Sequence, residues 1–214
     1  MLRVHGITES RAARVIWMCR ELGLDYEQEL VHFANDTKRS PQFLHVNPNG
    51  KIPAIDDDGF HLSESMAINI YLAKKHASAL MPAGLHGEAL TLQWSFWVVA
   101  DVEKPLLSLL LHRTEFEPSS IVGEYLGDRF TSSPAREQSF LEALERPFTV
   151  LDEQLRNRDY LLGFDFTVAD LNVASVLIWA LLADVDLHRW PNLQSWLERC
   201  TSREAANHHE FAIR

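Results

Sequence analysis

Cysteine is scarce in this sequence: Cys19 and Cys200 are the only two, and they form no CxxC pair. Two isolated thiols exclude a disulfide framework and are typical of a reducing compartment. No uncharged apolar run reaches the roughly 20 residues that a membrane-spanning helix needs. Residues 1–6 also lack the apolar core of a secretory signal. These absences predict a soluble protein of the cytoplasm without a membrane partner.

The sequence has no basic tract either. It carries 20 Lys and Arg against 30 Asp and Glu, a formal net charge of −10, so it repels phosphate backbones and nucleic acid is not an expected partner. Its ten histidines show no HExxH or other ligand spacing, and we expect no metal. The chain has 214 residues and is 46% hydrophobic and 23% charged, an ordinary globular balance that suits one large domain or two small ones.

Residues 1–78 alternate between short strand and helix patterns. The expected elements are a strand at 2–5, a helix from 12 to a stop at Gly23, a strand at 29–33, a loop at 38–41, strands at 51–55 and 60–62 around the Asp58-Gly59 turn, and a helix capped by Ser63 that runs to about 76. A βαβ unit with a right-handed crossover, followed by a hairpin and a covering helix, gives a small mixed sheet. This part is therefore expected to be an α/β domain.

Strand patterns stop after a connector at residues 79–87. The expected helices lie near 90–105, with a kink at Pro105, and over 134–155, 168–182 and 191–200. The segment 168–182 is strongly apolar, as a central buried helix is. Residues 88–214 are therefore expected to form a second, all-helical domain.

The most informative segment is Asn-Pro-Asn-Gly-Lys-Ile-Pro-Ala-Ile at residues 47–55, with Ser65 ten residues after its end. Pro53 cannot donate to a strand ladder and belongs at an edge, so Ile52 presents its N–H and C=O to an extended peptide. Glu64 and Ser65 fall in the first turn of the next helix, where free amides and the dipole favour a carboxylate. Glu64 adds a charge for an ammonium group, so the pair suits a zwitterionic amino-acid head. Each feature alone also has a structural explanation, as an N-cap or a strand end.

These segments resemble those of the cytosolic glutathione S-transferases, and the similarity extends over nearly the whole chain. The segments that carry it are residues 10–17, 21–27, 47–55, 64–68, 166–170 and 190–193. The resemblance implies a thioredoxin-like first domain, an all-helical second domain that holds the second substrate, and a homodimer. It also implies that glutathione is the co-substrate and that a small hydrophobic electrophile is the other partner.

By the family pattern, Ile52 pairs its backbone with the cysteinyl unit of glutathione, and Pro53 is cis. Glu64 and Ser65 hold the γ-glutamyl head, and Lys51 matches a position that neutralises the glycine carboxylate in some branches. The resemblance implies a conjugating transferase with a role in detoxification. Two alternatives stay open: another glutathione-dependent enzyme, such as an isomerase, dehalogenase or disulfide reductase, or a non-catalytic binding protein on the same fold.

The catalytic position must keep the glutathione sulfur ionised, although a free thiol has a pKa of roughly 8.5. A hydroxyl donor beside a helix N-terminus lowers that pKa by about one or two units. Ser10 lies where the first loop enters the first helix and precedes Arg14 by four residues, the spacing of the serine-type branches. Thr8 is the rival donor in the same loop, and a plain N-cap is the structural alternative for Ser10. No tyrosine stands near the first strand, and Cys19 lies two turns inside the helix.

Two carboxylates stand out in the helical part. Thr167 and Asp170 have the spacing of a capping box, with Asp in place of the usual Glu, and are expected to be structural. Asp101 continues an apolar stripe on one helix face, so we expect it to face inward and to need a partner. The stripe comprises Leu90, Trp94, Trp97 and Val98. The partner is either a basic residue, such as Lys104 or one from the first domain, or glutathione bound across a dimer interface.

Overall fold

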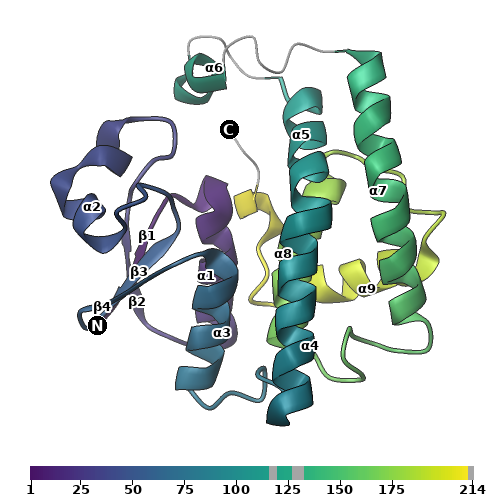
Figure 1. The fold of residues 1–214 in the computed structure, drawn as a ribbon, viewed down its shortest axis with the longest axis horizontal. Coiled ribbons are helices and arrows are strands. Elements are labelled where there is room, and N and C mark those ends of the chain that lie inside the picture. The colour runs from purple at the N-terminus through teal and green to yellow at the C-terminus, as the bar shows by residue number, and fades with distance from the viewer. Residues whose placement is uncertain (116–119, 127–132, 212–214) are drawn as a thin grey trace. The chain divides into compact units, whose positions relative to one another are not determined.

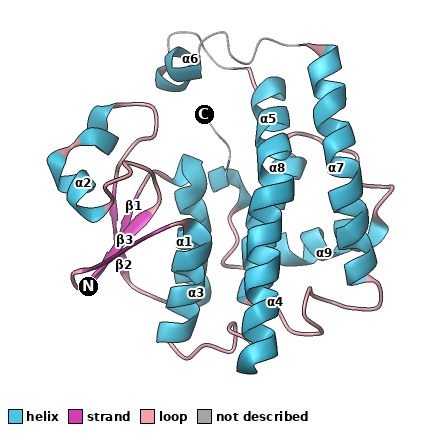
Figure 2. Cartoon of the chain, viewed as in Figure 1, coloured by secondary structure: helices cyan, strands magenta, loops and turns pink. Residues whose placement is uncertain are grey.

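The computed structural model describes residues 1–115, 120–126 and 133–211 of the chain (Figure 1). The chain divides into two units. One is Met1–Ala79 together with the C-terminal segment that begins at Glu204, and the other is Leu80–Arg203. Within the described residues, the strands of the sheet all belong to the first unit, and the second unit is built from helices (Figure 2).

The C-terminal segment was expected in the helical domain, but the structure groups it with the first unit. Two contacts explain this. Arg20 makes two hydrogen bonds of 2.8 Å to the carboxylate of Glu210. Phe211 packs edge-on against Trp17, with ring centroids 6.3 Å apart. The segment is therefore attached to the first helix of the α/β unit.

The first unit is built around a four-stranded sheet with the order β2-β1-β3-β4. The strands are β1 (Leu2–His5), β2 (Tyr26–Glu29), β3 (Ala54–Asp57) and β4 (Phe60–Ser63). β1 runs parallel to β2 and antiparallel to β3, which forms a hairpin with β4. The hairpin turns at Asp58 and Gly59, whose φ angles of 52° and 90° suit the two-residue turn expected there. The sheet confirms the α/β class expected for this part.

β2 differs from the expectation of a strand at 29–33. Its sequence, Tyr-Glu-Gln-Glu, is polar and alternates between half-buried and exposed positions, as strands with one solvated face do. The apolar signal that suggested a later strand comes from Val31. That side chain is buried in a cluster with Phe43 and Ala54, although it lies beyond the end of the strand.

Helices lie on both faces of this sheet (Figure 1). They are α1 (Ala13–Glu21) and α3 (Ser65–Lys75) on one face, and α2 (Pro41–Val46), preceded by a 3-10 turn (Asp36–Arg39), on the other. On the first face, the Asp57 carboxylate accepts a hydrogen bond of 2.7 Å from the hydroxyl of Tyr71 in α3. On the second face, the Phe43 ring of α2 contacts His5 of β1, with centroids 5.7 Å apart. This is the thioredoxin-like arrangement that the resemblance implies.

Two helix starts differ from the expectation. α2 was not expected, although its start has clear signals: Ser40 accepts a hydrogen bond of 3.2 Å from the Phe43 N–H, and Pro41 occupies the first turn. Ser63 does not cap α3. It is the last residue of β4, and Glu64, with a φ of 73°, immediately precedes the helix.

The second unit confirms the all-helical class expected for the later part of the chain. Its helices are α4 (Gly84–Trp97), α5 (Lys104–Arg113), α6 (Ile121–Leu126), α7 (Pro134–Leu155), α8 (Val168–Leu182) and α9 (Pro191–Thr201). Every side chain from 168 to 180 is buried, so α8 is the central helix. α7 and α8 have the expected bounds. Among the described residues, no helix combines the length and the hydropathy needed to cross a membrane.

The prediction that Asp101 faces inward is wrong. A π-helical turn, Val98–Glu103, joins α4 to α5, and its wider turn shifts the repeat by one residue. Val102 and Glu103 are buried there, whereas Asp101 is exposed. Pro105 lies in the first turn of α5, where a missing N–H is tolerated, so the irregular turn precedes the proline.

The expected capping box at the start of α8 is present. The Asp170 carboxylate accepts hydrogen bonds from the N–H and the hydroxyl of Thr167, both at 2.9 Å. It also accepts from the N–H of Leu161 at 2.7 Å and from the indole N–H of Trp196 at 2.9 Å. Asp170 therefore connects α8 to the preceding loop and to α9, which the spacing alone did not indicate.

Candidate functional site

One row of paired residues defines an end of the sheet. His5 of β1 pairs with Ala54 of β3, and Ala54 pairs with Ser63 of β4. The chain leaves the sheet just beyond this row in three places. The three segments are residues 6–12 after β1, 50–53 before β3, and 64–65 after β4. All five residues predicted from the sequence to bind or activate glutathione lie on these segments, so the strand register places them at one end of the sheet.

Gly6 shows how closely two of these segments approach each other. It has a φ of 140°, and a Cβ at this position would lie 2.8 Å from the Cβ of Ala12 and 3.3 Å from the Cβ of Ile52. The backbone therefore passes between the start of the first helix and the Ile52 side chain. Only glycine leaves room for that packing and adopts that φ without strain.

Ile52 lies just outside the ladder, because β3 begins at Ala54. The Ile52–Pro53 peptide bond is cis, as the resemblance implies. The Ile52 side chain packs against the cluster of Val31, Phe43 and Ala54. Its own N–H and C=O make no hydrogen bond with any other described residue. Ile52 thus has a fixed side chain and an open main chain, which is what an extended peptide ligand requires.

The start of α3 provides the second part of the site. The first helical hydrogen bond joins the Ile68 N–H to the Glu64 C=O at 2.9 Å, so the N–H groups of the three residues before Ile68 have no partner in the helix. Ser65 is only 6% exposed, and its hydroxyl makes no hydrogen bond within the described chain. The Glu64 carboxylate is exposed and forms no ion pair there. Open donors beside a free carboxylate can bind both charges of an amino-acid head group.

Lys51 provides a positive charge on the segment 50–53, which precedes β3. Its side chain is exposed, and within the described residues its ammonium group forms no ion pair. By contrast, the neighbouring Lys38 ammonium donates to the carbonyl of Phe33. An exposed and unpaired ammonium next to the open main chain of Ile52 can attract a ligand carboxylate at low cost.

The two hydroxyl groups of the first loop are already hydrogen-bonded. Ser10 Oγ donates to the carbonyl of Ile7 at 2.6 Å and accepts from the N–H of Ala12 at 3.1 Å. Its extended backbone, with φ of −144° and ψ of −173°, completes the geometry of an N-cap. Thr8 Oγ1 donates to the Glu9 carboxylate at 3.1 Å. Ser10 therefore has the structural role considered above. A catalytic role requires its hydroxyl to redirect its hydrogen bond from the Ile7 carbonyl to a ligand.

The cysteines are not available for chemistry in the folded protein. Cys19 and Cys200 are both buried and form no disulfide. Burial raises the pKa of the Cys19 thiol to about 12, so this group stays protonated at neutral pH. Across the described chain, no group of three or more His, Cys, Asp or Glu side chains is arranged to hold a metal ion.

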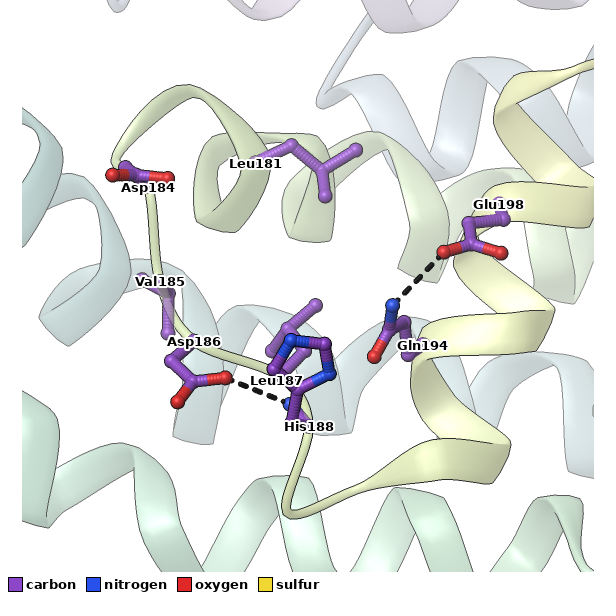
Figure 3. A pocket seen from close by; sticks show the side chains of 8 residues that line it. All are labelled: Leu181, Asp184, Val185, Asp186, Leu187, His188, Gln194 and Glu198. Carbon is purple, nitrogen blue, oxygen red and sulfur yellow. Dashed lines mark hydrogen bonds between the residues drawn. The ribbon is translucent and has the colours of Figure 1, made fainter.

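The second unit contains a pocket of about 360 Å³ between the end of α8 and α9 (Figure 3). Its lining residues are Leu181, Asp184, Val185, Asp186, Leu187, His188, Gln194 and Glu198. None of the predicted site residues lines it. The carboxylates of Asp184, Asp186 and Glu198 would repel an anionic ligand, so this pocket does not suit glutathione.

The sequence pattern gave Asn47 no role of its own, although the residue begins the segment 47–55. The structure buries Asn47 and hydrogen-bonds its side chain within that segment. The available signal was the order of residues: an asparagine at a helix end, followed by the Pro48-Asn49-Gly50 turn.

Comparison with known proteins matches segments of both units to the same family. The family model described as the glutathione S-transferase N-terminal domain matches residues 2–74, and that of the C-terminal domain matches residues 121–204. Disulfide-bond oxidoreductase YfcG of Escherichia coli is 30% identical over 212 residues, which cover 96% of this chain and 92% of the relative. A glutathione S-transferase of Arabidopsis thaliana is 30% identical over 90% of this chain and 87% of the relative. The solved structure of a glutathione S-transferase I bound with lactoylglutathione matches 99% of this chain and 98% of its own, with a TM-score of 0.83 and 26% identity.

Proposed function

The chain belongs to the glutathione S-transferase family, and from this premise we propose that it catalyses attack of the glutathione thiolate on small hydrophobic electrophiles. Glutathione is the co-substrate. The observation that carries the proposal is the row His5, Ala54 and Ser63, beyond which the open main chain of Ile52 and the start of α3 lie at the same end of the sheet.

Glutathione is an extended tripeptide with an amino-acid head at one end and a carboxylate at the other. Ile52 pairs with its cysteinyl unit as an added strand pairs with a sheet edge. The open amides and hydroxyl at Ser65 donate hydrogen bonds to the α-carboxylate of the γ-glutamyl head, and the Glu64 carboxylate binds its ammonium group. Lys51 neutralises the glycine carboxylate at the opposite end. These contacts orient the ligand so that its sulfur faces the first loop.

Ser10 stabilises the thiolate in this proposal. Its hydroxyl rotates away from the Ile7 carbonyl and donates a hydrogen bond to the sulfur, beside the first free amides of α1, while the thiol proton leaves to water. Lowering the thiol pKa by one unit corresponds to about 1.4 kcal/mol in favour of the thiolate. The ionised sulfur then attacks the electrophile, a new carbon–sulfur bond forms, and the leaving group departs with the electron pair.

Ser10→Ala tests this role, with a chlorinated nitroaromatic as the electrophile. We expect kcat/KM at pH 7 to fall by up to about tenfold, and the pH profile of kcat/KM to move to higher pH, because the thiol pKa rises by about one unit. Ser10→Thr keeps a hydroxyl and should retain most activity. Thr8→Val should leave the profile unchanged. Full activity in Ser10→Ala, or a loss confined to Thr8→Val, removes Ser10 from the mechanism.

Disulfide reduction is the second candidate, because a relative at 30% identity is named a disulfide-bond oxidoreductase. With Cys19 and Cys200 buried, the electrons would come from glutathione alone. One glutathione attacks the substrate disulfide, a second resolves the mixed disulfide, and oxidised glutathione leaves. Turnover of a small disulfide in a Cys19→Ser, Cys200→Ser double variant, at a higher rate than any conjugation, favours this reaction over the transferase reaction.

We also propose that the chain forms a homodimer. A different face of α4 from that of Trp94 exposes three apolar side chains at helical spacing. Leu85 is 81% exposed, Leu92 43% and Phe96 70%. Apolar stripes of this kind favour association with a second surface. Light scattering should give twice the chain mass for the unmodified protein, and Phe96→Lys should shift it towards the single chain. A single-chain mass in the unmodified protein contradicts the dimer.

The cellular setting of the proposal is the cytoplasm, with a role in detoxification. Its support is chemical: two cysteines that form no disulfide suit a compartment where glutathione is reduced, and conjugation makes a hydrophobic electrophile more polar. Deletion of the gene in its host should increase sensitivity to such electrophiles, and unchanged sensitivity argues against this role.

A further inference from the structure

Asn47 is held by four hydrogen bonds in the turn that leads to the open main chain of Ile52. It follows the last residue of α2 and is 3% exposed. Its N–H donates to the Phe43 carbonyl at 2.8 Å, and its C=O accepts from the Gly50 N–H at 2.9 Å. Phe43 itself is buried in the cluster against which Ile52 packs. The main chain of Asn47 is therefore held at both of its polar groups.

The side chain of Asn47 closes the same turn. Its Nδ2 donates to the carbonyl of Lys51 at 2.7 Å, and its Oδ1 accepts from the N–H of Asn49 at 3.1 Å. One partner can only accept and the other can only donate, so one orientation of the amide satisfies both. An aspartate at this position keeps the acceptor but has no donor for Lys51.

The bond to the Lys51 carbonyl fixes the direction of the Ile52 N–H. The Lys51–Ile52 peptide unit is planar and trans, so its N–H points away from its C=O. Asn47 holds the C=O inside the turn. The Ile52 N–H consequently points out of the turn, and it has no partner among the described residues.

We propose that Asn47 is a positioning residue for glutathione: by holding the Lys51 carbonyl, it directs the Ile52 N–H towards the cysteinyl unit of the ligand. The proposal rests on the proposed function, because it assigns Asn47 to the same site. Asn47 does not touch glutathione. It acts through one peptide plane, so its removal should weaken glutathione binding while the electrophile is bound as before.

Asn47→Asp tests the proposal, with Asn49→Asp as the matched control. Both variants add one negative charge to the same turn, but only the first removes the donor to the Lys51 carbonyl. The Asn49 side chain is exposed and makes no hydrogen bond within the described residues. We expect Asn47→Asp to raise the KM for glutathione by about ten- to a hundredfold, the cost of a small misplacement of a binding group. The KM for the electrophile should stay within about twofold, and Asn49→Asp should resemble the unmodified enzyme.

A purely structural role for Asn47 has a different signature. It would lower the melting temperature and the fraction of active protein but leave the KM for glutathione unchanged, and this result overturns the proposal. If Asn47→Asp does not fold, amide hydrogen exchange of the unmodified protein decides. The Ile52 amide should exchange rapidly without glutathione and be protected with it, and protection without ligand overturns the proposal.

Different results would overturn the proposed function and the positioning role of Asn47. If the unmodified protein does not bind reduced glutathione, the proposed function fails whatever Asn47 does. If the unmodified protein binds glutathione and Asn47→Asp binds it equally well, the function stands and only the positioning role fails.

Discussion

Replacing Asp170 by alanine probes the interior of the helical unit. The carboxylate is fully buried and accepts hydrogen bonds from the Leu161 N–H, the Thr167 N–H and hydroxyl, and the Trp196 indole. Burial raises the pKa of the Asp170 carboxyl, and these four donated hydrogen bonds oppose that rise. Alanine removes every acceptor at once.

The magnitude follows from the donors left behind. Three buried N–H groups lose their acceptor, and each unsatisfied buried donor costs about 1–3 kcal/mol. Partial relaxation around the truncated side chain lowers the total, so we expect a loss of about 3–5 kcal/mol in the free energy of unfolding. A helix N-cap in contact with water is worth only about 1 kcal/mol. The difference reflects the bonds to Leu161 and Trp196, which a capping box does not include.

Asp152 provides the matched control. Its carboxylate accepts from the Asn192 N–H at 2.8 Å and the Leu193 N–H at 3.0 Å at the start of α9, but it is only half-buried. Water can replace it, so Asp152→Ala should cost about 1 kcal/mol. Urea denaturation followed by circular dichroism measures both variants. An Asp170→Ala loss equal to that of Asp152→Ala would refute the buried-network account.

Three further predictions concern the first unit and the thiols. Because Cys19 and Cys200 are buried, a thiol reagent should label neither in the folded protein and both after denaturation; rapid labelling of the folded protein contradicts this. Burial lowers the pKa of His5, so the folded state favours the neutral ring, and stability should fall as pH drops below the unfolded value of about 6.5. Urea titrations at pH 7 and pH 5 should show that His5→Asn reduces this fall, and an unchanged pH dependence contradicts the assignment. Gly6→Ala should lower the melting temperature and weaken glutathione binding more than Gly59→Ala, because both have positive φ but only Gly6 has a side-chain carbon 2.8 Å from the added Cβ; equal effects contradict the close packing.

Elements with strong local signals were predictable from the sequence. The Asp58-Gly59 hairpin and the helices that begin at Pro134 and Val168 have turn residues, caps or periodicity that do not depend on distant partners. β2 was misplaced because an edge strand is mostly polar, while the apolar Val31 next to it is buried by contacts with α2 and β3. Burial by distant segments cannot be read from a short window.

The site also contains residues that were predictable from the sequence and others that were not. The motif identified Ile52, Glu64 and Ser65, and the strand register places their segments at one end of the sheet. The hydrogen bond of Asn47 to Lys51 was not predictable, because it forms only when the whole turn closes. The exposure of Asp101 was likewise hidden, since a helical repeat gives no sign of a π-helical turn.

The central claim is that reduced glutathione lies along Ile52 with its amino-acid head at the start of α3. Isothermal titration calorimetry with reduced glutathione tests it most directly, on the unmodified protein and on Glu64→Gln and Ser65→Ala. We expect saturable heat with one glutathione bound per chain, and a loss of affinity of at least about tenfold in each variant, equivalent to about 1.4 kcal/mol. Absence of binding heat at millimolar glutathione, or equal affinity in all three proteins, would contradict the account.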